Sequence, residues 1–270
     1  MSESAVKLSV CVITRNEEHH IERCLRSVTF ANEWVVLDSG SQDNTLNRAS
    51  ALGAAVHSSA DWPGFGRQKN RALALARGEW VFSMDADEWV SAELAQSIQA
   101  ALQAPERDAY WVVRRSRFCG KLVRYGDWGG DRVLRLFRRQ SARFTDDLVH
   151  ERVEAPLPQG ELAGFLWHDS VESLADAREK MLRYAELGAR KIRERRTDRV
   201  SLRSRWRPTL AAVRGHWTFV RGYLLRGGFL DGAAGWQIAR LNARGTYLRY
   251  HWSRYSEEVA HALAELESNL

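Results

Sequence analysis

Residues 80–88 read Trp-Val-Phe-Ser-Met-Asp-Ala-Asp-Glu, an apolar run that ends in three carboxylates within four residues. The apolar part follows Gly78 and is typical of a buried strand. Carboxylates this close repel one another unless a cation lies between them, and open α/β sheets bind ligands beyond the carboxyl ends of their strands. The stretch therefore predicts a divalent metal ion that holds a phosphorylated ligand. A solvated turn before a helix capped by Ser91 is the alternative interpretation.

The segments around this stretch alternate between strand-like and helix-like patterns. Strands are predicted at residues 8–13, 34–37, 54–57 and 80–84, helices at 45–52 and 69–76, and further helices that bury the apolar residues of 21–28 and 94–102. Asn16 is the expected cap of the first helix. Strands and helices that alternate at this spacing predict a mainly parallel sheet flanked by helices.

The pattern changes after Pro105. Short strands are predicted near residues 110–113, 133–137 and 148–149, with no long helix between them, which indicates an α+β addition to the same sheet. From Ser173 onward the apolar spacing is helical. The expected architecture is an α/β domain over residues 1–170, followed by a helical region over residues 171–270.

Composition sets limits on the class of protein. Hydrophobic residues make up 44% of the 270-residue chain, which predicts a real core. Three scattered cysteines indicate neither a disulfide framework nor a zinc site, so reduced thiols in a cytosolic protein are expected. The polar first residues do not predict a signal peptide, and no apolar stretch reaches the roughly 18 residues that span a bilayer.

The positive charge is concentrated in the carboxyl-terminal part. The whole chain has a net charge of +6, and residues 171–270 contain 19 Lys and Arg against 11 Asp and Glu. Residues 199–254 contain 11 Arg, four Trp and one acid, Asp231. A basic region rich in Trp predicts an anionic partner, which is either a membrane or a nucleic acid.

Four motifs follow one another in the first ninety residues. They are Thr-Arg-Asn-Glu at 14–17, Asp-Ser-Gly-Ser-Gln-Asp-Asn-Thr at 38–45, Gly-Phe-Gly-Arg-Gln-Lys-Asn at 64–70, and the stretch from Gly78 to Glu88. As an ordered set they are specific, and the chain resembles the glycosyltransferase family 2 enzymes of the GT-A fold. The resemblance is dense over residues 7–92 and thinner to about 155. It implies a nucleotide-binding part at about 1–104 and an acceptor part at about 105–170.

The resemblance also implies roles for individual residues. Glu17 and Asp38 are expected to contact the uracil or ribose of a UDP-sugar, Asp85 the ribose or sugar, and Asp87 a Mn²⁺ or Mg²⁺ ion. Lys69 is predicted at a helix start behind a glycine loop, where a phosphate would be favoured. The full set of expected donor-binding residues is Thr14, Asn16, Glu17, Asp38, Gly40, Lys69 and Asp85.

A second cluster, Asp-Asp-Leu-Val-His-Glu at 146–151, contains the candidate general base. Sugar transfer needs a group that takes the proton from the attacking acceptor hydroxyl. Glu151 is the expected base, and His150 is the expected metal ligand or its neighbour. The reverse assignment remains open, and Asp146 and Asp147 are further candidates.

The basic region contains an amphipathic pattern. After Pro208, an apolar stripe at helical spacing is flanked by Arg214 and Arg221; its members are Leu210, Val213, Trp217, Val220 and Leu224. The stripe indicates either a helix in the headgroup region of a membrane or a helix that packs on the catalytic domain. The Gly-Phe-Leu-Asp-Gly segment at 228–232 resembles the lipopolysaccharide core glycosyltransferases of family 2, which add β-linked glucose to inner-core heptose.

The predicted function is a metal-dependent, inverting transfer of a hexose, expected to be glucose, from a UDP-sugar to a lipid-anchored glycan. The expected acceptor is the inner-core heptose of lipopolysaccharide, and the expected location is the inner face of the cytoplasmic membrane, bound through its anionic surface. The same fold with a polyprenyl phosphate, protein or other glycan acceptor is the alternative. A noncatalytic nucleic-acid-binding protein is disfavoured, because the chain has no RNA-binding signature.

Overall fold

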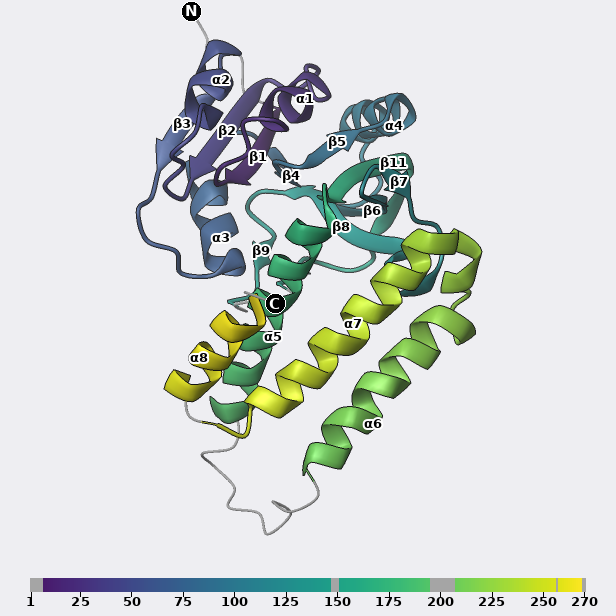
Figure 1. Cartoon of the computed structure of the whole chain (residues 1–270). Helices are drawn as coiled ribbons and strands as arrows, with labels where there is room; N and C mark the ends of the chain where they lie inside the picture. The colour runs from purple at the N-terminus through teal and green to yellow at the C-terminus, as the bar shows by residue number, and fades with distance from the viewer. Residues whose placement is uncertain (1–6, 147–150, 195–206, 256, 269–270) are drawn as a thin grey trace, which may run out of the picture. The chain divides into compact units, whose positions relative to one another are not determined.

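The structure is a computed structural model that describes residues 7–146, 151–194, 207–255 and 257–268 (Figure 1). The chain forms two compact units. The sheet unit contains Met1–Arg115 and Gly130–His168, and the helical unit contains Ser116–Gly129 and Asp169–Leu270. Residues 116–129 thus group with the helices, and the domain boundary expected at residue 170 stays a prediction.

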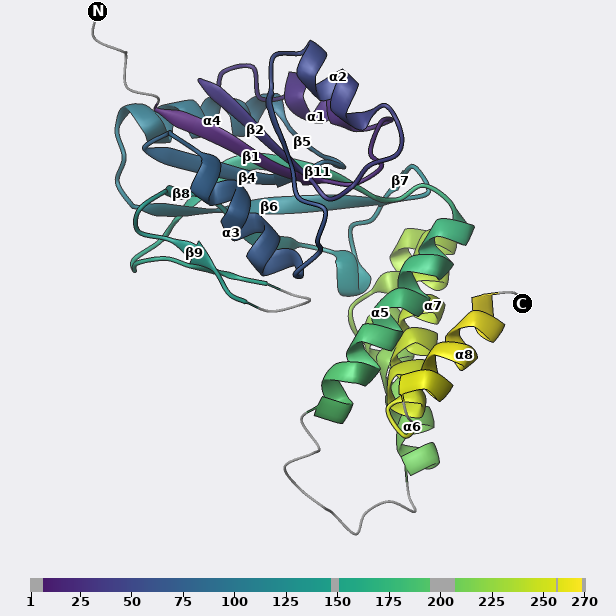
Figure 2. The same cartoon turned by 90° about the vertical axis from the view of Figure 1, so that its left-hand side faces the viewer.

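Four parallel strands form the first half of the sheet unit. They are β1 (Leu8–Thr14), β2 (Glu33–Asp38), β3 (Ala55–Ser58) and β4 (Trp80–Asp85), in the order β3-β2-β1-β4. The helices between them are α1 (Ile21–Arg26), α2 (Thr45–Ala51) and α3 (Phe65–Leu75). Figure 2 shows α1 and α2 on one face of the sheet and α3 on the other. The predicted alternation of strands and helices is confirmed.

Antiparallel strands continue this sheet beyond β4. Within the described residues the full order is β3-β2-β1-β4-β8-β6-β11-β5, with β7 beside β6. The added strands are β5 (Glu88–Val90), β6 (Ala109–Phe118), β7 (Lys121–Leu122), β8 (Asp131–Arg138) and β11 (Gly160–Val171). A separate ribbon consists of β9 (Arg143–Phe144) and β10 (Val153–Glu154). The predicted extension is confirmed, and the strand predicted at 148–149 lies outside the described residues.

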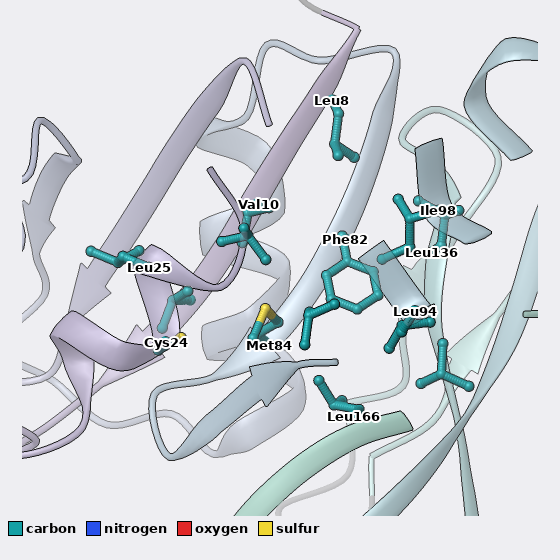
Figure 3. Packing of buried hydrophobic residues seen from close by; sticks show 14 of the residues in the cluster. Leu8, Val10, Cys24, Leu25, Phe82, Met84, Leu94, Ile98, Leu136 and Leu166 are labelled. Atoms are coloured by element: carbon teal, nitrogen blue, oxygen red, sulfur yellow. The ribbon is translucent and has the colours of Figure 1, made fainter. Parts of the chain in front are cut away.

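The sheet is buried on both faces, as expected for parallel strands covered by helices. Val10 belongs to the hydrophobic cluster that Figure 3 shows, which also contains residues of α1 and of α4 (Ala92–Gln103), whereas its neighbour Cys11 belongs to a second cluster with residues of α3. Ser91 caps α4 as predicted, because its Oγ accepts a hydrogen bond from the backbone N of Leu94 at 3.1 Å. This packing holds the strand ends at defined positions.

The helical unit is built around α7. Its helices are η1 (Gly126–Trp128), α5 (Leu174–Glu194), α6 (Arg207–Phe219), the π-helix η3 (Val220–Leu225), η4 (Gly228–Asp231), α7 (Gly232–Trp252) and α8 (Glu257–Ser268). Figure 1 shows α7 between α5 and α6. A Cβ on Gly215 would lie 3.0 Å from the carbonyl oxygen of Ala243, so a small residue lets α6 and α7 approach closely. The helical region predicted from Ser173 is confirmed.

No helix in the described part of the chain is both long and apolar enough to cross a membrane.

Candidate active site

The carboxyl ends of β1, β2 and β4 meet at one edge of the sheet. The register places Thr14 beside Asp38 and Ile13 beside Asp85. Asp87 follows two residues after the end of β4. The structure therefore brings together the strand ends from which the donor-binding residues were predicted, and this edge is the candidate site.

The loops after β1 and β2 are joined by hydrogen bonds. Asp38 is buried, and its Oδ2 accepts hydrogen bonds from the backbone N of Gly40 (2.8 Å) and of Ser41 (2.9 Å). Gly40 has a φ of 91°, a conformation that favours glycine. The Oδ1 of Asn16 accepts a hydrogen bond from the backbone N of Gln42 at 2.8 Å. Asp38 thus shapes the loop that contains Gly40.

The predicted capping role of Asn16 is wrong. Helix α1 begins at Ile21, with His20 at the N-cap position. Asn16 adopts a φ of 55°, in the left-handed region that Asn tolerates better than most residues. Its side chain instead accepts the hydrogen bond from Gln42, which connects the loop after β1 to the loop after β2.

Glu17 and Thr14 lie at the same edge. The Oε2 of Glu17 is 2.8 Å from Nδ1 of His20, and its backbone N donates to Oγ1 of Thr45 at 2.8 Å. Thr14 is buried, and its Oγ1 has no hydrogen-bond partner among the described residues. A buried hydroxyl of this kind is expected to be satisfied by a ligand or by water.

Lys69 joins two carboxylates in the interior of the site. Its side chain is only 4% exposed, and its Nζ lies 2.9 Å from Oδ1 of Asp85 and 2.7 Å from Oε1 of Glu151. The predicted position of Lys69 at a helix start is wrong, because α3 begins at Phe65 and Lys69 follows one turn later. Its contact with phosphate stays a prediction, and its observed contacts are with carboxylates.

Arg135 on β8 extends this cluster. One terminal nitrogen of its guanidinium lies 2.9 Å from Oδ2 of Asp85 and 2.7 Å from Oε1 of Glu88. Glu88 is fully buried, and Arg114 also contacts its Oε1, at 3.2 Å. Glu88 belongs to the predicted carboxylate stretch, whereas Arg135 and Arg114 reach it from strands that are distant in the chain, so no local sequence pattern predicts their contacts.

The buried cluster is defined as Lys69, Asp85, Glu88, Arg114 and Arg135, and the pKa shifts of Asp85 and Arg135 favour their charged forms. Burial raises the pKa of Asp85, but the cations of Lys69 and Arg135 lower it more, so this pKa is held well below its ordinary value. Burial lowers the pKa of Arg135, but Glu88 and Asp85 raise it above its ordinary value. Paired charges of this kind hold one another in a defined geometry.

His168 lies beside Asp87. Residue 168 on β11 pairs with Glu88 on β5, which brings its Nε2 to 3.3 Å from Oδ2 of Asp87. Burial lowers the pKa of His168, but the Asp87 carboxylate raises it more, and the pKa lies above its ordinary value. No sequence motif surrounds His168, so its position beside Asp87 is not predicted by the sequence.

The pair of Asp87 and His168 fits a divalent metal ion. A carboxylate oxygen and an imidazole nitrogen are suitable ligands for Mn²⁺, and carboxylates suit Mg²⁺. Within the described residues, no group of three or more His, Cys, Asp or Glu could hold a metal. The arrangement that fits is therefore a site of two protein ligands completed by the phosphates of a substrate, as is common for Mg²⁺.

The four candidates for the general base lie in different surroundings or outside the described residues. His150 and Asp147 lie outside the described residues. Asp146 is 67% exposed and lies 3.6 Å from Nε of Arg67. Glu151 is the candidate that is linked to Asp85, because the ammonium group of Lys69 contacts both carboxylates. Its role as the base stays a prediction, as does the metal-binding role of His150.

The chain is similar to proteins named as glycosyltransferases. The family model for glycosyl transferase family 2 matches residues 9–154. An uncharacterized glycosyltransferase of Rickettsia typhi is 26% identical, over 90% of this chain and 85% of that protein. The lipopolysaccharide core biosynthesis glycosyltransferase LpsC of Rhizobium meliloti is 32% identical, over 57% of this chain and 58% of LpsC.

Other similarities cover only part of the chain or have a low sequence identity. A TPR repeat-containing protein of Synechococcus elongatus is 36% identical over 56% of this chain and 36% of its own length, so the chain spans about a third of that relative. Glucosyl-3-phosphoglycerate synthase from Mycobacterium tuberculosis, solved with Mn²⁺, UDP and phosphoglyceric acid, matches 42% of this chain and 44% of its own at 30% identity, with a TM-score of 0.35. S. aureus TarS (1–349) matches 97% of this chain and 89% of its own at 17% identity, with a TM-score of 0.46.

Proposed function

Because this chain belongs to glycosyl transferase family 2, we propose that it transfers a sugar, expected to be glucose, from a UDP-sugar to a lipid-anchored glycan with inversion at the anomeric carbon. The observation that supports this proposal most strongly is the pair of Asp87 and His168 beside the buried cluster, at the edge where β1, β2 and β4 end.

The donor is proposed to lie along this edge. Asp38 and Glu17 would contact the uracil or ribose, and the hydroxyl of Thr14, which has no partner among the described residues, is available to the same ligand. Asp85 would contact the ribose or sugar. Lys69 and Arg135 hold both oxygens of the Asp85 carboxylate, so its orientation is set before the donor binds. Such preorganisation removes reorganisation cost from the reaction.

Asp87 and His168 are proposed to hold the divalent ion. When bound, Mn²⁺ or Mg²⁺ supplies positive charge that stabilises the diphosphate as it leaves. Because a protonated imidazole cannot act as a ligand, metal binding at His168 is expected to weaken as the pH falls.

Glu151 is proposed to act as the base. Its carboxylate would take the proton from the acceptor hydroxyl while that oxygen bonds to the anomeric carbon and the bond from this carbon to the UDP oxygen breaks. Lys69 fixes Glu151 and Asp85 relative to each other, since its ammonium group contacts both. Lys69 is thus a positioning residue for the base as well as for the donor side.

The acceptor is proposed to be the inner-core heptose of a lipopolysaccharide at the inner face of the cytoplasmic membrane. The similarity to LpsC, whose name refers to lipopolysaccharide core biosynthesis, supports this choice. The basic helical region supports an anionic membrane surface as the location, without a nucleic-acid partner. A polyprenyl phosphate, a protein or another glycan would use the same donor site.

The test is a transfer assay with a panel of UDP-sugars and defined acceptors, including heptose-terminated lipopolysaccharide precursors. Asp87→Asn and His168→Ala should each lower turnover by at least ~100-fold, and a chelator should abolish activity that Mn²⁺ or Mg²⁺ restores. Asp108→Asn is the matched control, because Asp108 is half-exposed and pairs with Arg138 at the opposite edge of the sheet. Full turnover by Asp87→Asn would contradict the proposal.

A further inference from the structure

Helix α6 and the π-helix η3 carry an exposed apolar stripe. Val213 is 63% exposed, Trp217 55% and Leu224 53%. Leu210 belongs to the same stripe and is also exposed. Large apolar side chains that gather on one exposed face mark an interaction surface, whereas single exposed ones need no explanation.

The stripe lies opposite the face through which α6 packs. Ala211 and Gly215 are buried on the side of α6 that meets α7. At 100° per residue, Val213 and Trp217 point away from that side. Ala211 and Gly215 thus face α7, and Phe219 at the end of α6 contacts the ring of Trp236 on α7. Val213 and Trp217 lie on the other side of the helix and remain exposed.

The surroundings of the stripe are cationic. From Arg207 to Leu230 the chain contains four Arg and no acidic residue. Arg214 lies over the ring of Tyr250, with its guanidinium carbon 4.3 Å from the ring centroid, and contacts the hydroxyl of the same residue. Arg221 is 42% exposed and Arg226 is 52% exposed, and both pair with Oδ1 of Asp127, at 3.1 Å and 2.8 Å. An apolar face flanked by arginines complements an apolar layer that lies beneath anionic groups.

The turn after η3 extends this surface. Gly227 has a φ of 71°, which reverses the chain between η3 and η4. Leu225, Phe229 and Leu230 on either side of it are exposed. Beside the turn is an open depression of about 450 Å³ that Arg124, Tyr125 and Arg226 line together with two glycines. Because Arg226 is half-exposed while it pairs with Asp127, it can also contact an external phosphate.

We propose that α6, η3 and the turn at Gly227 lie in the headgroup region of a membrane that contains anionic phospholipid. Val213, Trp217 and Leu224 insert among the acyl chains, and Arg214, Arg221 and Arg226 contact lipid phosphates. A bilayer fits better than a second copy of this chain, because two copies would bring together the same segment 207–230, which contains four Arg and no acidic residue of its own. The inference extends the proposed function by naming the surface that meets the acceptor's membrane.

The experiment is flotation of the full chain with vesicles. We expect co-flotation with vesicles of phosphatidylcholine and about 30 mol % phosphatidylglycerol, weak binding to phosphatidylcholine alone, and release at high salt. The combined variant Val213→Ser, Trp217→Ser and Leu224→Ser should lower the partition coefficient at least ~10-fold. Leu266→Ser is the control, because Leu266 is equally exposed on α8.

Several results would overturn the inference. The first is wild-type protein that does not float with anionic vesicles. The second is a stripe variant that floats as well as the wild type does. The third is a stripe variant whose only change is the loss of a dimer, as measured by light scattering. Loss of folding is checked by thermal denaturation, and Arg214→Gln should separately reduce the preference for anionic lipid. Hydrolysis of the UDP-sugar measures the proposed function independently of membrane binding. The stripe variant should retain this hydrolysis. If the wild type did not hydrolyse any UDP-sugar, the proposed transfer reaction would be contradicted, but the flotation result would stand.

Discussion

Arginine has opposite surroundings in the two units. In the sheet unit, Arg135 is nearly inaccessible and contacts the carboxylates of Asp85 and Glu88. In the helical unit, Arg214 is exposed, and its contacts in the structure are with Tyr250. Burying a charge is costly unless it is paired, so Arg135 is held in one geometry. Arg214 has no such constraint and can adapt to an external anion.

The contrast separates two uses of the same residue type. The buried cluster fixes the orientation of Asp85, and the orientation of a site residue matters for chemistry. The exposed arginines beside the α6 stripe provide charge near an apolar surface, and their exact positions matter little for stability. Substitutions in the buried cluster should therefore change folding and activity, whereas substitutions on α6 should change association with a membrane.

The largest effect is expected for Arg135→Met. Removing this guanidinium leaves Asp85 and Glu88 in the interior with fewer cations, which should cost about 3–5 kcal/mol of unfolding free energy. Arg132→Met on the same strand is the matched control, because Arg132 is 52% exposed and pairs with an exposed Glu161, and it should cost no more than about 1 kcal/mol. Urea denaturation measures both, and equal losses would remove the distinction between buried and exposed pairs.

Lys69→Met should mainly reduce catalysis. Without the ammonium group, Asp85 and Glu151 repel each other and lose their relative position, and we expect turnover to fall by about 100-fold. Arg67→Met on the same helix is the control, since Arg67 is exposed and its partner Asp146 is on the surface. Steady-state kinetics with a saturating donor gives the comparison. If Lys69→Met kept wild-type turnover, Lys69 would not position the site.

The buried cluster should also affect acid stability. The folded pKa of Asp85 lies well below its ordinary value of 3.8, so its ionised form contributes stability above that pH, and this contribution is lost as the pH falls further. The difference in unfolding free energy between wild type and Asp85→Asn should therefore shrink below pH 3.8, by up to about 1.4 kcal/mol for each pH unit. Chemical denaturation at a series of pH values measures it, and a constant difference would show that the pairing is weak.

The smallest effect is expected for Val213→Ser. Because Val213 is 63% exposed and lies away from α7, its substitution should change the unfolding free energy by less than about 0.5 kcal/mol. Ala211→Ser on the buried side of the same helix is the comparison and should cost more, since it places a hydroxyl against α7. A larger loss for Val213→Ser would show that the stripe packs within the protein.

Local patterns in the sequence predicted much of the sheet unit. Apolar runs and their periodicity located β1 to β4 and the helices between them, because a strand or helix that buries one face must repeat at a fixed spacing. The polar ends of β1, β2 and β4 were located in the same way. Parallel strands then place their carboxyl ends at one edge, so the approximate position of the candidate site followed from the order of elements alone.

Contacts between distant segments were decided only by the tertiary structure. His168 reaches Asp87 because β11 returns antiparallel beside β5, and Arg135 reaches Asp85 from β8; no local periodicity encodes either approach. Lys69 was expected at a helix start, yet α3 begins earlier despite Gly66, since its packing on the sheet outweighs the low helix propensity of glycine.

The apolar stripe on α6 shows the same division. The spacing of Val213, Trp217 and Leu224 predicts one shared face, because the helical repeat is a local property. An identical repeat arises whether such a face meets a protein core or a bilayer. Which side packs depends on the fold: the small residues Ala211 and Gly215 admit the close approach of α7, and Val213, Trp217 and Leu224 remain exposed.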